Sequence, residues 1–369
     1  MLYSSTLYLP HLPPLTAVAL QQAHAPERVA GYDSLPPSLQ AALVFAWQWV
    51  HGHERFTLTT SGSTGPPKTI EASRQQMLVS VALTRQALGL TSQHTSLLCL
   101  NAAYIGGTMM IARSLQLGMD MQWVPPVANP LVKLSPPPDF IAVVPLQLET
   151  ILRETPHLLE GIHAILVGGA PIRLALEEAI RTRVTAPVYS TYGMTETLSH
   201  IALRRLNGSE ASADFRVLGD THIDTDERGC LTIQGKITRH QRIVTNDLVA
   251  ITAPQRFRWQ GRYDWVINSG GVKVSPEEVA RVAEQKLNQA GSSPRFFVIG
   301  LPDERLGERV VLVVEGEPAP EEEQQRLLQS MAAEVPRYHA PKEIHYFRQF
   351  VETSSGKIDR RATIAQVSE

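Results

Sequence analysis

One ten-residue stretch gathers hydroxyl side chains, two glycines and a lysine: Thr59-Thr60-Ser61-Gly62-Ser63-Thr64-Gly65-Pro66-Pro67-Lys68. Glycine lets the backbone approach a ligand closely. Successive backbone N–H groups in such a turn form a concave site for an anion. Lys68 adds a point charge suited to phosphate. We interpret the stretch as a triphosphate-binding loop, and the rest of the chain is considered outward from it.

The nearest alternative for this loop is the Walker A sequence of P-loop NTPases, G-x-x-x-x-G-K-[ST]. The segment from Gly62 to Thr69 almost fits, but Pro67 stands at the position of the second glycine. Proline has no backbone N–H, so it removes one phosphate donor. Taken alone, the stretch is also compatible with a polar surface turn.

Beyond the loop, strand patterns alternate with helix patterns. Ser73 predicts the N-terminal cap of a helix that Gly89 ends. The expected helices span 74–88, 106–117, 147–153 and 172–183, and the expected strands span 96–100, 121–124, 140–144, 164–167 and 187–191. This alternation indicates an α/β domain with a largely parallel sheet.

The C-terminal part of the chain has a different pattern of expected helices and strands. From Asp214 onward, short β segments at 229–233, 243–245 and 248–252 predict a small β subdomain. A second unit follows, with helices expected at 276–289 and 321–334 and strands at 295–300 and 309–315. We therefore predict an N-terminal domain over residues 1–263 and an α+β domain over residues 264–369 that is long enough to fold alone.

Composition excludes several classes of function. The net charge is −2 over 369 residues and no basic run is present, which argues against a nucleic-acid partner. No stretch has the length and apolarity of a membrane span. Cys99 and Cys230 form no disulfide framework and no metal-ligand spacing. No basic leader precedes the first prolines, so a cytoplasmic location is expected.

Four further stretches lie at expected turns or strand ends, and three of them contain glycine. They are Gly168-Gly169-Ala170-Pro171, Tyr192-Gly193-Met194-Thr195-Glu196-Thr197, Asn246-Asp247 and the stretch from Gly261 to Gly271. Each has a plain structural reading when taken singly, as a strand-to-helix turn, a helix start or a loop. Chemically, a carboxylate such as Glu196 suits a Mg²⁺ ion that bridges phosphate oxygens.

The loop Ser61-Gly62-Ser63-Thr64-Gly65-x-Pro67-Lys68 resembles the phosphate loop of the acyl-adenylate-forming (ANL) enzymes. The stretches at 192–197, 246–247 and 261–271, and Ser355-Gly356-Lys357-Ile358-Asp359-Arg360, resemble later motifs of the same enzymes in the same order. That superfamily contains acyl-CoA synthetases, adenylation domains of peptide synthetases and luciferases. The resemblance implies ATP, Mg²⁺ and CoA as ligands, a small carboxylic acid as substrate, and a mobile lid formed by the C-terminal domain. The full prediction of fold class is α/β, with a large N-terminal domain of mostly parallel sheets plus the small β subdomain, followed by this lid.

The resemblance also implies a role for each matching residue. Lys357 is the catalytic lysine, Thr195 contacts the α-phosphate, and Glu196 coordinates Mg²⁺. Asp247 binds the ribose hydroxyls, although Asn246 replaces the usual glycine before it, at a turn that Asn tolerates. The remaining positions that resemble nucleotide- or CoA-binding residues are Thr60, Ser61, Gly62, Ser63, Thr64, Gly65, Lys68, Gly169, Ala170, Tyr192, Gly193, Arg262, Gly270 and Gly271, with Asp264 as the hinge of the lid.

Within the superfamily, residues 103–110, 191–203 and 266–273 resemble o-succinylbenzoate–CoA ligases of menaquinone biosynthesis. The implied activity is an ATP-dependent acid–thiol ligase. Tyr104, Ser199 and His200 are candidate acyl-pocket residues, and Arg113 and Arg204 are candidate cations for a second carboxylate. A histidine after a helix start is more often structural, and surface arginines are usually solvated.

Alternatives remain open from the sequence. A stand-alone adenylation enzyme that loads a carrier-protein thiol is the main rival, and a P-loop NTPase or an inactive scaffold are the others. The scaffold is disfavoured because Lys68, Glu196, Asp247, Arg262 and Lys357 are all present. Fewer residues precede the phosphate loop than is usual in the superfamily, so part of the acyl-pocket wall and the usual dimer surface are expected to be reduced. A homodimer is one option for the oligomeric state.

Overall fold

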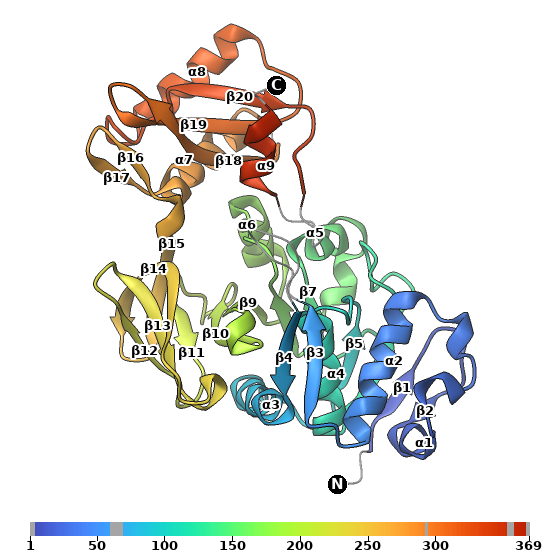
Figure 1. Ribbon diagram of the computed structural model, residues 1–369. Coiled ribbons are helices and arrows are strands. Elements are labelled where there is room, and N and C mark those ends of the chain that lie inside the picture. The colour runs from blue at the N-terminus through green and yellow to red at the C-terminus, as the bar shows by residue number, and fades with distance from the viewer. Residues whose placement is uncertain (1–3, 60–68, 292–293, 353–357, 367–369) are drawn as a thin grey trace.

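The computed structural model describes residues 4–59, 69–291, 294–352 and 358–366. The ribbon shows a large body built on one long sheet and, above it, a smaller body with its own sheet (Figure 1). The chain passes from one body to the other at the end of strand β15 (Arg256–Arg262). We refer to the smaller body as the lid.

The centre of the large body is parallel, as the strand–helix alternation predicts. Within the described residues, the sheet has 13 strands in the order β12-β13-β14-β15-β11-β10-β9-β8-β7-β5-β6-β1-β2. Neighbouring strands from β9 to β1 run parallel. The strands of this half are β1 (Thr6–Tyr8), β2 (Leu15–Thr16), β5 (Thr95–Leu98), β6 (Asp120–Trp123), β7 (Phe140–Val143), β8 (Ala164–Val167) and β9 (Val188–Gly193).

The helices of the large body follow their local signals closely. They are α1 (Ala17–Gln22), α2 (Pro37–Val50), α3 (Arg74–Leu88), α4 (Ile105–Leu117), α5 (Pro145–Glu154) and α6 (Leu174–Arg183). The Ser73 side chain accepts a hydrogen bond from the Gln76 N–H, and Gly89 ends α3 with a left-handed φ of 65°. Helix α6 begins later than predicted, with Arg173 at the N-cap, so Pro171 lies in the preceding turn.

The predicted small β subdomain is an antiparallel continuation of the same sheet. Its strands are β10 (His200–Arg205), β11 (Phe215–Val217), β12 (His222–Thr225), β13 (Cys230–Gln234), β14 (Ile243–Ala253) and β15. The two β segments expected at 243–245 and 248–252 form the single strand β14, so the turn expected at Asn246-Asp247 is wrong. Pairing of β14 with β15 continues past this point, with shifts of register between Leu248 and Val249 and between Ile251 and Ala253.

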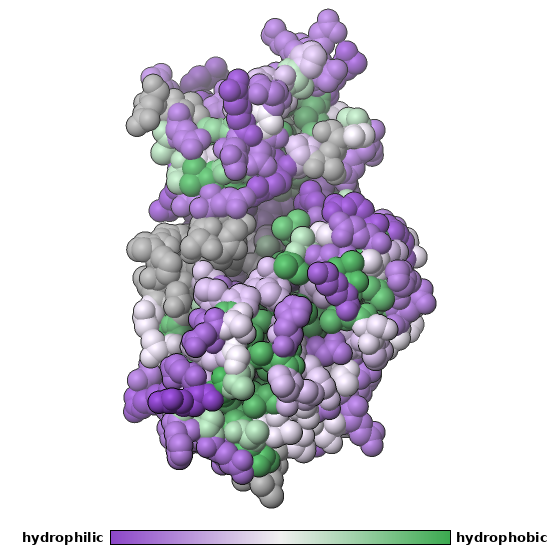
Figure 2. All heavy atoms as spheres, turned by 90° about the vertical axis from the view of Figure 1, so that its right-hand side faces the viewer, coloured by the Kyte–Doolittle hydropathy of each residue, from purple (hydrophilic) through white to green (hydrophobic). Residues whose placement is uncertain are grey.

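The large body has apolar clusters on both sides of its sheet. Helices α2, α3 and α4 contribute to one cluster, in which Trp49 and Met77 are fully buried. Helices α5 and α6 contribute Ile151 and Ile180 to the other. Figure 2 shows hydrophilic side chains over most of the lid, whereas apolar side chains gather on the upper part of the large body.

The lid matches the predicted α+β pattern. Its sheet has the order β17-β16-β19-β18, with β20 on the other side of β19. The elements are β16 (Ile267–Ser269), β17 (Val272–Val274), α7 (Pro276–Gln289), β18 (Phe296–Asp303), β19 (Gly307–Glu315), α8 (Glu321–Ala332), β20 (Glu343–Phe347) and α9 (Arg360–Ala365). None of the helices in the described residues has the length and apolar character needed to cross a membrane.

Candidate active site

The segment after β9 presents two of the predicted catalytic residues. It forms the short 3-10 helix η4 (Thr195–Thr197), in which Thr195 is half-buried and Glu196 is exposed. The turn is closed locally, because the Thr197 hydroxyl accepts a hydrogen bond from the Met194 N–H at 3.1 Å and donates one to the Ser199 carbonyl at 2.8 Å. Thr195 and Glu196 thus lie at the carboxyl end of a central strand, where ligands bind in α/β sheets.

Gly193 is required at this point by close packing. A Cβ atom at Gly193 would lie 2.3 Å from the Ser199 carbonyl oxygen and 2.6 Å from the His200 Cα. Any other residue would push the backbone of η4 away from β10. The turn after β8 lies beside it, since β8 and β9 are paired, and Gly169 there has a left-handed φ of 86°. Gly169 and Ala170 are both exposed.

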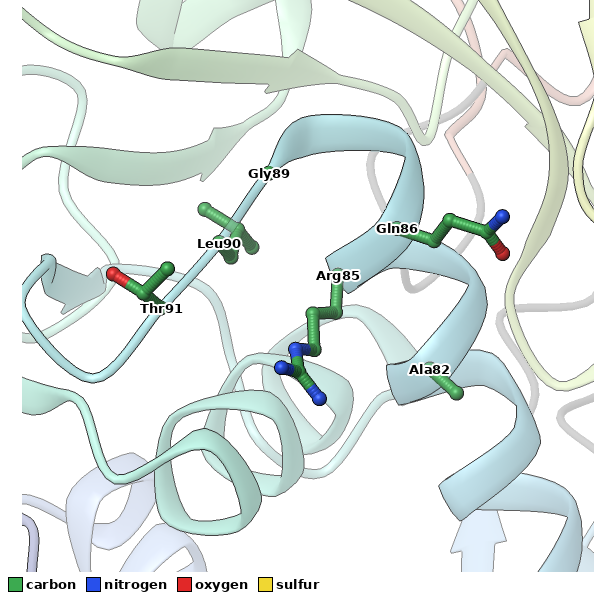
Figure 3. A pocket seen from close by; sticks show the side chains of 6 residues that line it. All are labelled: Ala82, Arg85, Gln86, Gly89, Leu90 and Thr91. Atoms are coloured by element: carbon green, nitrogen blue, oxygen red, sulfur yellow. The ribbon is translucent and has the colours of Figure 1, made fainter.

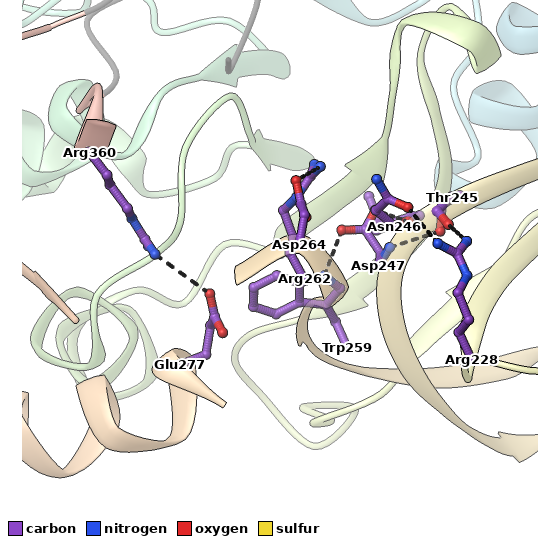
Figure 4. Close-up of polar contacts among 10 residues, drawn as sticks. Arg228, Thr245, Asn246, Asp247, Trp259, Arg262, Asp264, Glu277 and Arg360 are labelled. Atoms are coloured by element: carbon purple, nitrogen blue, oxygen red, sulfur yellow. Dashed lines mark hydrogen bonds and ion pairs between the residues drawn. The ribbon is translucent and has the colours of Figure 1, made fainter. Parts of the chain in front are cut away.

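Asp247 lies at the middle of a hydrogen-bonded group. Its Oδ2 accepts a 2.7 Å bond from the Tyr192 hydroxyl, and its Oδ1 accepts a 3.2 Å bond from the Trp259 Nε1 (Figure 4). Burial, followed by the neighbouring Asp247 carboxylate, raises the pKa of Tyr192, so this hydroxyl stays protonated and acts as a donor. The Tyr192 ring packs edge-on against Phe257, with ring centroids 5.0 Å apart. The structure therefore gives Tyr192 a structural partner in Asp247, and the predicted contact of Tyr192 with the nucleotide stays a prediction.

Trp259 is a site residue that our sequence reasoning missed. It lies on β15 opposite Val249, close to the pair formed by Asp247 and Arg262 across the two strands. A tryptophan amid polar residues on an exposed strand was the available signal. Its indole N–H holds the second oxygen of Asp247, so both carboxylate oxygens are oriented.

Arg262 and Asp264 form a pair of their own. The Arg262 Nε and Nη2 donate to the two oxygens of Asp264 at 2.8 and 2.9 Å. Burial alone would raise the pKa of Asp264, but the bonds from Arg262 outweigh it and hold that pKa below its usual range. Arg262 is thus placed beside Asp247 but is held by Asp264, so a ligand phosphate or ribose would compete with this carboxylate for it.

A second polar group lies behind η4, between α3, α4 and β10. The Arg113 side chain on α4 is 3% exposed, and its Nη2 donates to the Ser199 hydroxyl at 2.7 Å. The Arg113 Nε is buried without a hydrogen-bond partner among the described residues. Burial lowers the pKa of Arg113 to about 10. The expectation of a solvated arginine is therefore wrong for Arg113.

His200 belongs to the same group. Its Nε2 lies 3.0 Å from the Thr84 hydroxyl. Burial, followed by the charge of Arg113, lowers the pKa of His200 well below its usual range, so the ring is neutral. Arg204 does not join them, because both of its terminal nitrogens pair with Glu177 at 2.8 Å. Tyr104 is the N-cap of α4, roughly 14 Å from Arg113 along the helix axis.

Two comparisons with known proteins bear on this arrangement. Residues 49–235 match the family described as AMP-binding enzyme, and residues 278–357 match the AMP-binding enzyme C-terminal domain. The chain belongs to the AMP-binding enzyme family. This assignment places both the large body and the lid within one enzyme architecture.

Several relatives of this AMP-binding enzyme are known. The chain is 39% identical to an acyl-CoA synthetase (AMP-forming)/AMP-acid ligase II-like protein from Dyadobacter fermentans, over 91% of this chain and 97% of that one, with a TM-score of 0.60. It is 27% identical to a probable 2-succinylbenzoate–CoA ligase of Mycobacterium tuberculosis, over 83% of each chain. The fold is shared with o-succinylbenzoate CoA synthetase from Bacillus subtilis in complex with the acyl-adenylate intermediate OSB-AMP (23% identity, TM-score 0.70, 83% of this chain and 68% of that chain).

The glycine pair predicted for the lid face forms a hairpin turn in this AMP-binding enzyme. Gly270 and Gly271 have φ values of 60° and 80° and connect β16 to β17, as the two-residue turns of tight hairpins require. A Cβ atom at Gly270 would lie 2.6 Å from the Tyr338 ring. The hairpin lies at the outer side of the lid, away from α9 (Figure 1). Its predicted contact with CoA remains a prediction.

Some predicted residues of the enzyme cannot be placed. Thr60, Ser61, Gly62, Ser63, Thr64, Gly65, Lys68 and Lys357 lie outside the described residues. The strands on either side of the phosphate loop are described, and β3 (Arg55–Thr59) pairs with β4 (Thr69–Ser73) in antiparallel register. The loop thus connects two paired strands of an AMP-binding enzyme.

The metal prediction concerns Glu196 alone. Among the described residues, no group of three or more His, Cys, Asp and Glu side chains is arranged so that it could hold a metal ion. Mg²⁺ in nucleotide sites commonly takes one or two carboxylates and completes its shell with phosphate oxygens and water. The exposed carboxylate of Glu196, which makes no ion pair recorded within the described part of the chain, fits that donor set.

A surface hollow elsewhere in the enzyme does not coincide with the candidate site. It has a volume of about 420 Å³ and lies at the end of α3 (Figure 3). Its lining residues are Ala82, Arg85, Gln86, Gly89, Leu90 and Thr91. None of them was predicted to bind ATP, Mg²⁺, CoA or the acid.

Proposed function

We propose that this AMP-binding enzyme is an acid–thiol ligase that converts o-succinylbenzoate to o-succinylbenzoyl-CoA, the activity named for its relatives. In the first step a substrate carboxylate oxygen attacks the α-phosphorus of ATP, and the bond to the β-phosphate breaks to release pyrophosphate. In the second step the CoA thiolate attacks the acyl carbon, and AMP leaves.

The described residues support the nucleotide end of this reaction. Thr195 and Glu196 directly follow β9, and Tyr192 on that strand donates a hydrogen bond to Asp247, which pairs with Arg262 across β14 and β15. Asp247 is held by Tyr192 and Trp259, so it would present an oriented carboxylate to ribose hydroxyls. Mg²⁺ bound at Glu196 would screen the repulsion between the substrate carboxylate and the phosphates.

The single observation that favours a dicarboxylic acid is the environment of Arg113. This guanidinium is buried, and no acidic side chain of the described residues pairs with it. A buried charge is costly unless an opposite charge compensates it. The second carboxylate of o-succinylbenzoate supplies that charge. Neutral His200 and the Ser199 hydroxyl beside Arg113 provide further polar contacts.

Arg113 is also close to the reacting end of the site. Ser199, which it contacts, packs against Gly193 at the base of η4. The position proposed for the second carboxylate and the segment that carries Thr195 and Glu196 are therefore connected through Ser199. An acid anchored at Arg113 would extend toward the α-phosphate from behind this segment.

We further propose that residues 1–263 and 264–369 are the two moving parts. The lid would turn about Asp264, bringing Lys357 to the site for adenylation and the Gly270-Gly271 hairpin for thioester formation. The pairing of Asp264 with Arg262 is one of the contacts at this junction. Exchange of two lid faces by domain rotation is an established way to run two reactions at one site.

The test is pyrophosphate release with ATP and Mg²⁺ across a panel of acids, each with and without CoA. We expect release with o-succinylbenzoate and sustained turnover only when CoA is added. The matched control is 4-oxo-4-phenylbutanoate, which lacks the ring carboxylate and should react poorly. Release with other aryl acids regardless of CoA would instead indicate carrier-protein loading, and no release with any acid would refute the ligase.

A cytoplasmic location and a homodimer complete the proposal. The location is proposed from the use of ATP and CoA, and the homodimer is the option proposed from the resemblance to acyl-CoA synthetases. Light scattering over a range of protein concentrations tests the oligomeric state, with a constant monomer mass as the contrary result. Cell fractionation tests the location.

A further inference from the structure

Arg360 makes an unusual set of contacts for a residue at the start of a short helix. It is the first residue of α9, and its guanidinium lies over the Trp265 ring, with Cζ 3.9 Å from the ring centroid. The same guanidinium lies 5.6 Å from the centroid of Phe297 on β18. Its side chain is 25% exposed, and burial lowers the pKa of Arg360. Arg360 therefore packs as a flat group between two aromatic rings.

Glu277 faces the same guanidinium from α7. Its Oε1 lies 4.0 Å from the Arg360 Nη1, and this oxygen has no hydrogen-bond partner among the described residues (Figure 4). Burial raises the pKa of Glu277. A Cβ atom at Gly261 would lie 2.5 Å from the Glu277 Oε2, so Glu277 also abuts the end of β15. The group formed by Arg360, Trp265 and Glu277 thus touches the strand that leads into the lid.

The chain on either side of Arg360 is tied to the lid by backbone bonds. The Asp359 N–H donates to the Val351 carbonyl at 2.8 Å, and the Thr363 hydroxyl accepts from the Val351 N–H at 3.1 Å. Asp359 also caps α9 by accepting from the Ala362 N–H at 2.9 Å. The start of α9, where Arg360 lies, is therefore anchored to Val351.

From these contacts we infer that Arg360 is a positioning residue that couples α9 to the junction between the two bodies. Trp265 directly follows Asp264 in the chain, so the guanidinium–indole contact fixes α9 to the first turn of the lid. Lys357 precedes α9 in the sequence. The inference rests on the proposed function for its kinetic consequence, because there Lys357 acts only in adenylation.

The kinetic test separates the two half-reactions of the full-length enzyme. We expect Arg360→Ala to lower the kcat of adenylation by about ten- to a hundredfold, as expected for a misplaced catalytic group. The KM for ATP and thioester formation from supplied acyl-adenylate should not change. Arg360→Lys keeps the charge but not the planar stacking, and should restore adenylation only in part. Arg326→Ala on α8, an exposed residue, is the matched control and should leave both steps unchanged.

A second measurement needs no substrate. The fluorescence of Trp265 is obtained by subtracting the spectrum of Trp265→Phe in each background. We expect the emission of Trp265 to shift to longer wavelength in Arg360→Ala, because removal of the guanidinium exposes the indole to water. Equal losses in both half-reactions, or an unchanged Trp265 spectrum in both Arg360 variants, would overturn the inference. Absence of any adenylation by the wild type would instead count against the proposed function. The fluorescence measurement would still test the contact between Arg360 and Trp265, because it does not depend on activity.

Discussion

Replacing Arg113 by Met should raise the free energy of unfolding and lower the activity with o-succinylbenzoate. Burial lowers the pKa of the Arg113 guanidinium to about 10, and this shift corresponds to about 3 kcal/mol of desolvation at about 1.36 kcal/mol per pH unit. The hydrogen bond to Ser199 returns about 1 kcal/mol. Arg113→Met removes both, so we expect a net gain of about 2 kcal/mol in the free energy of unfolding, within the range seen when buried ionic groups are replaced by apolar ones.

The same substitution should abolish recognition of the second carboxylate. A hydrogen bond to a charged group contributes about 1.5–3 kcal/mol, so kcat/KM for o-succinylbenzoate should fall by about ten- to a hundredfold. The rate with 4-oxo-4-phenylbutanoate, which has no ring carboxylate, should not fall. Stability is measured by urea unfolding without ligands and activity by pyrophosphate release.

Arg74 offers a matched control for this prediction. It is buried too, but its guanidinium donates to the carbonyls of Trp49 and His53 and lies 4.3 Å from the Trp49 ring centroid. Arg74→Met leaves these carbonyls without their partner, so it should destabilise the protein by about 2 kcal/mol. If Arg113→Met destabilised the protein as Arg74→Met does, or left turnover of the dicarboxylate unchanged, the reasoning would be refuted.

Three further predictions concern the same surroundings. The folded state disfavours protonated His200, so the unfolded state takes up the proton first, and the free energy of unfolding should fall by up to about 1.36 kcal/mol per pH unit below about pH 6.5. In urea titrations at several pH values, His200→Gln should flatten this slope. An unchanged slope would contradict a buried neutral ring. Gly193→Ala places a Cβ atom 2.3 Å from a backbone oxygen, so it should lower the free energy of unfolding by about 2–3 kcal/mol and remove most of the activity. Gly271→Ala, with open space around it, should lower the free energy of unfolding by only about 1 kcal/mol. Calorimetry and pyrophosphate release compare the two variants, and equal losses would argue against the clash. Asp264→Asn weakens the hold on Arg262 and should lower the KM for ATP in steady-state kinetics; a raised KM would show that Asp264 orients Arg262 for the nucleotide.

Local signals predicted the secondary structure well, because they depend on neighbouring residues only. Ser73 and Gly89 cap α3 as expected, and α7 begins and ends where the pattern predicts. The expected turn at Asn246-Asp247 was wrong because cross-strand pairing with β15 keeps the backbone extended there. Tertiary pairing outweighed a polar dipeptide that commonly forms turns.

Motifs indicated which residue types belong to the candidate site, but not which side chains contact one another there. The resemblance implies roles for Asp247 and Arg262 at the nucleotide and for Asp264 at the hinge, but the pairing of Arg262 with Asp264 is a side-chain geometry that no motif encodes. The burial of Arg113 had a weak signal, since α4 is apolar nearly all round and an arginine in such a helix must enter the interior. Its contact with Ser199 joins residues far apart in the chain and required the fold.

The packing of Gly193 against Ser199 has a consequence for how this enzyme could acquire a new substrate. Ser199 lines the pocket proposed for the acid, yet its backbone supports the turn that carries Thr195 and Glu196. Changes at Ser199 would alter selectivity and catalysis together. Thr84 on α3 and Arg113 on α4 contact His200 and Ser199 through side chains. Substitutions at these two positions would leave the backbone contact between Ser199 and Gly193 in place, so they are the simpler route to a new substrate by evolution or in the laboratory.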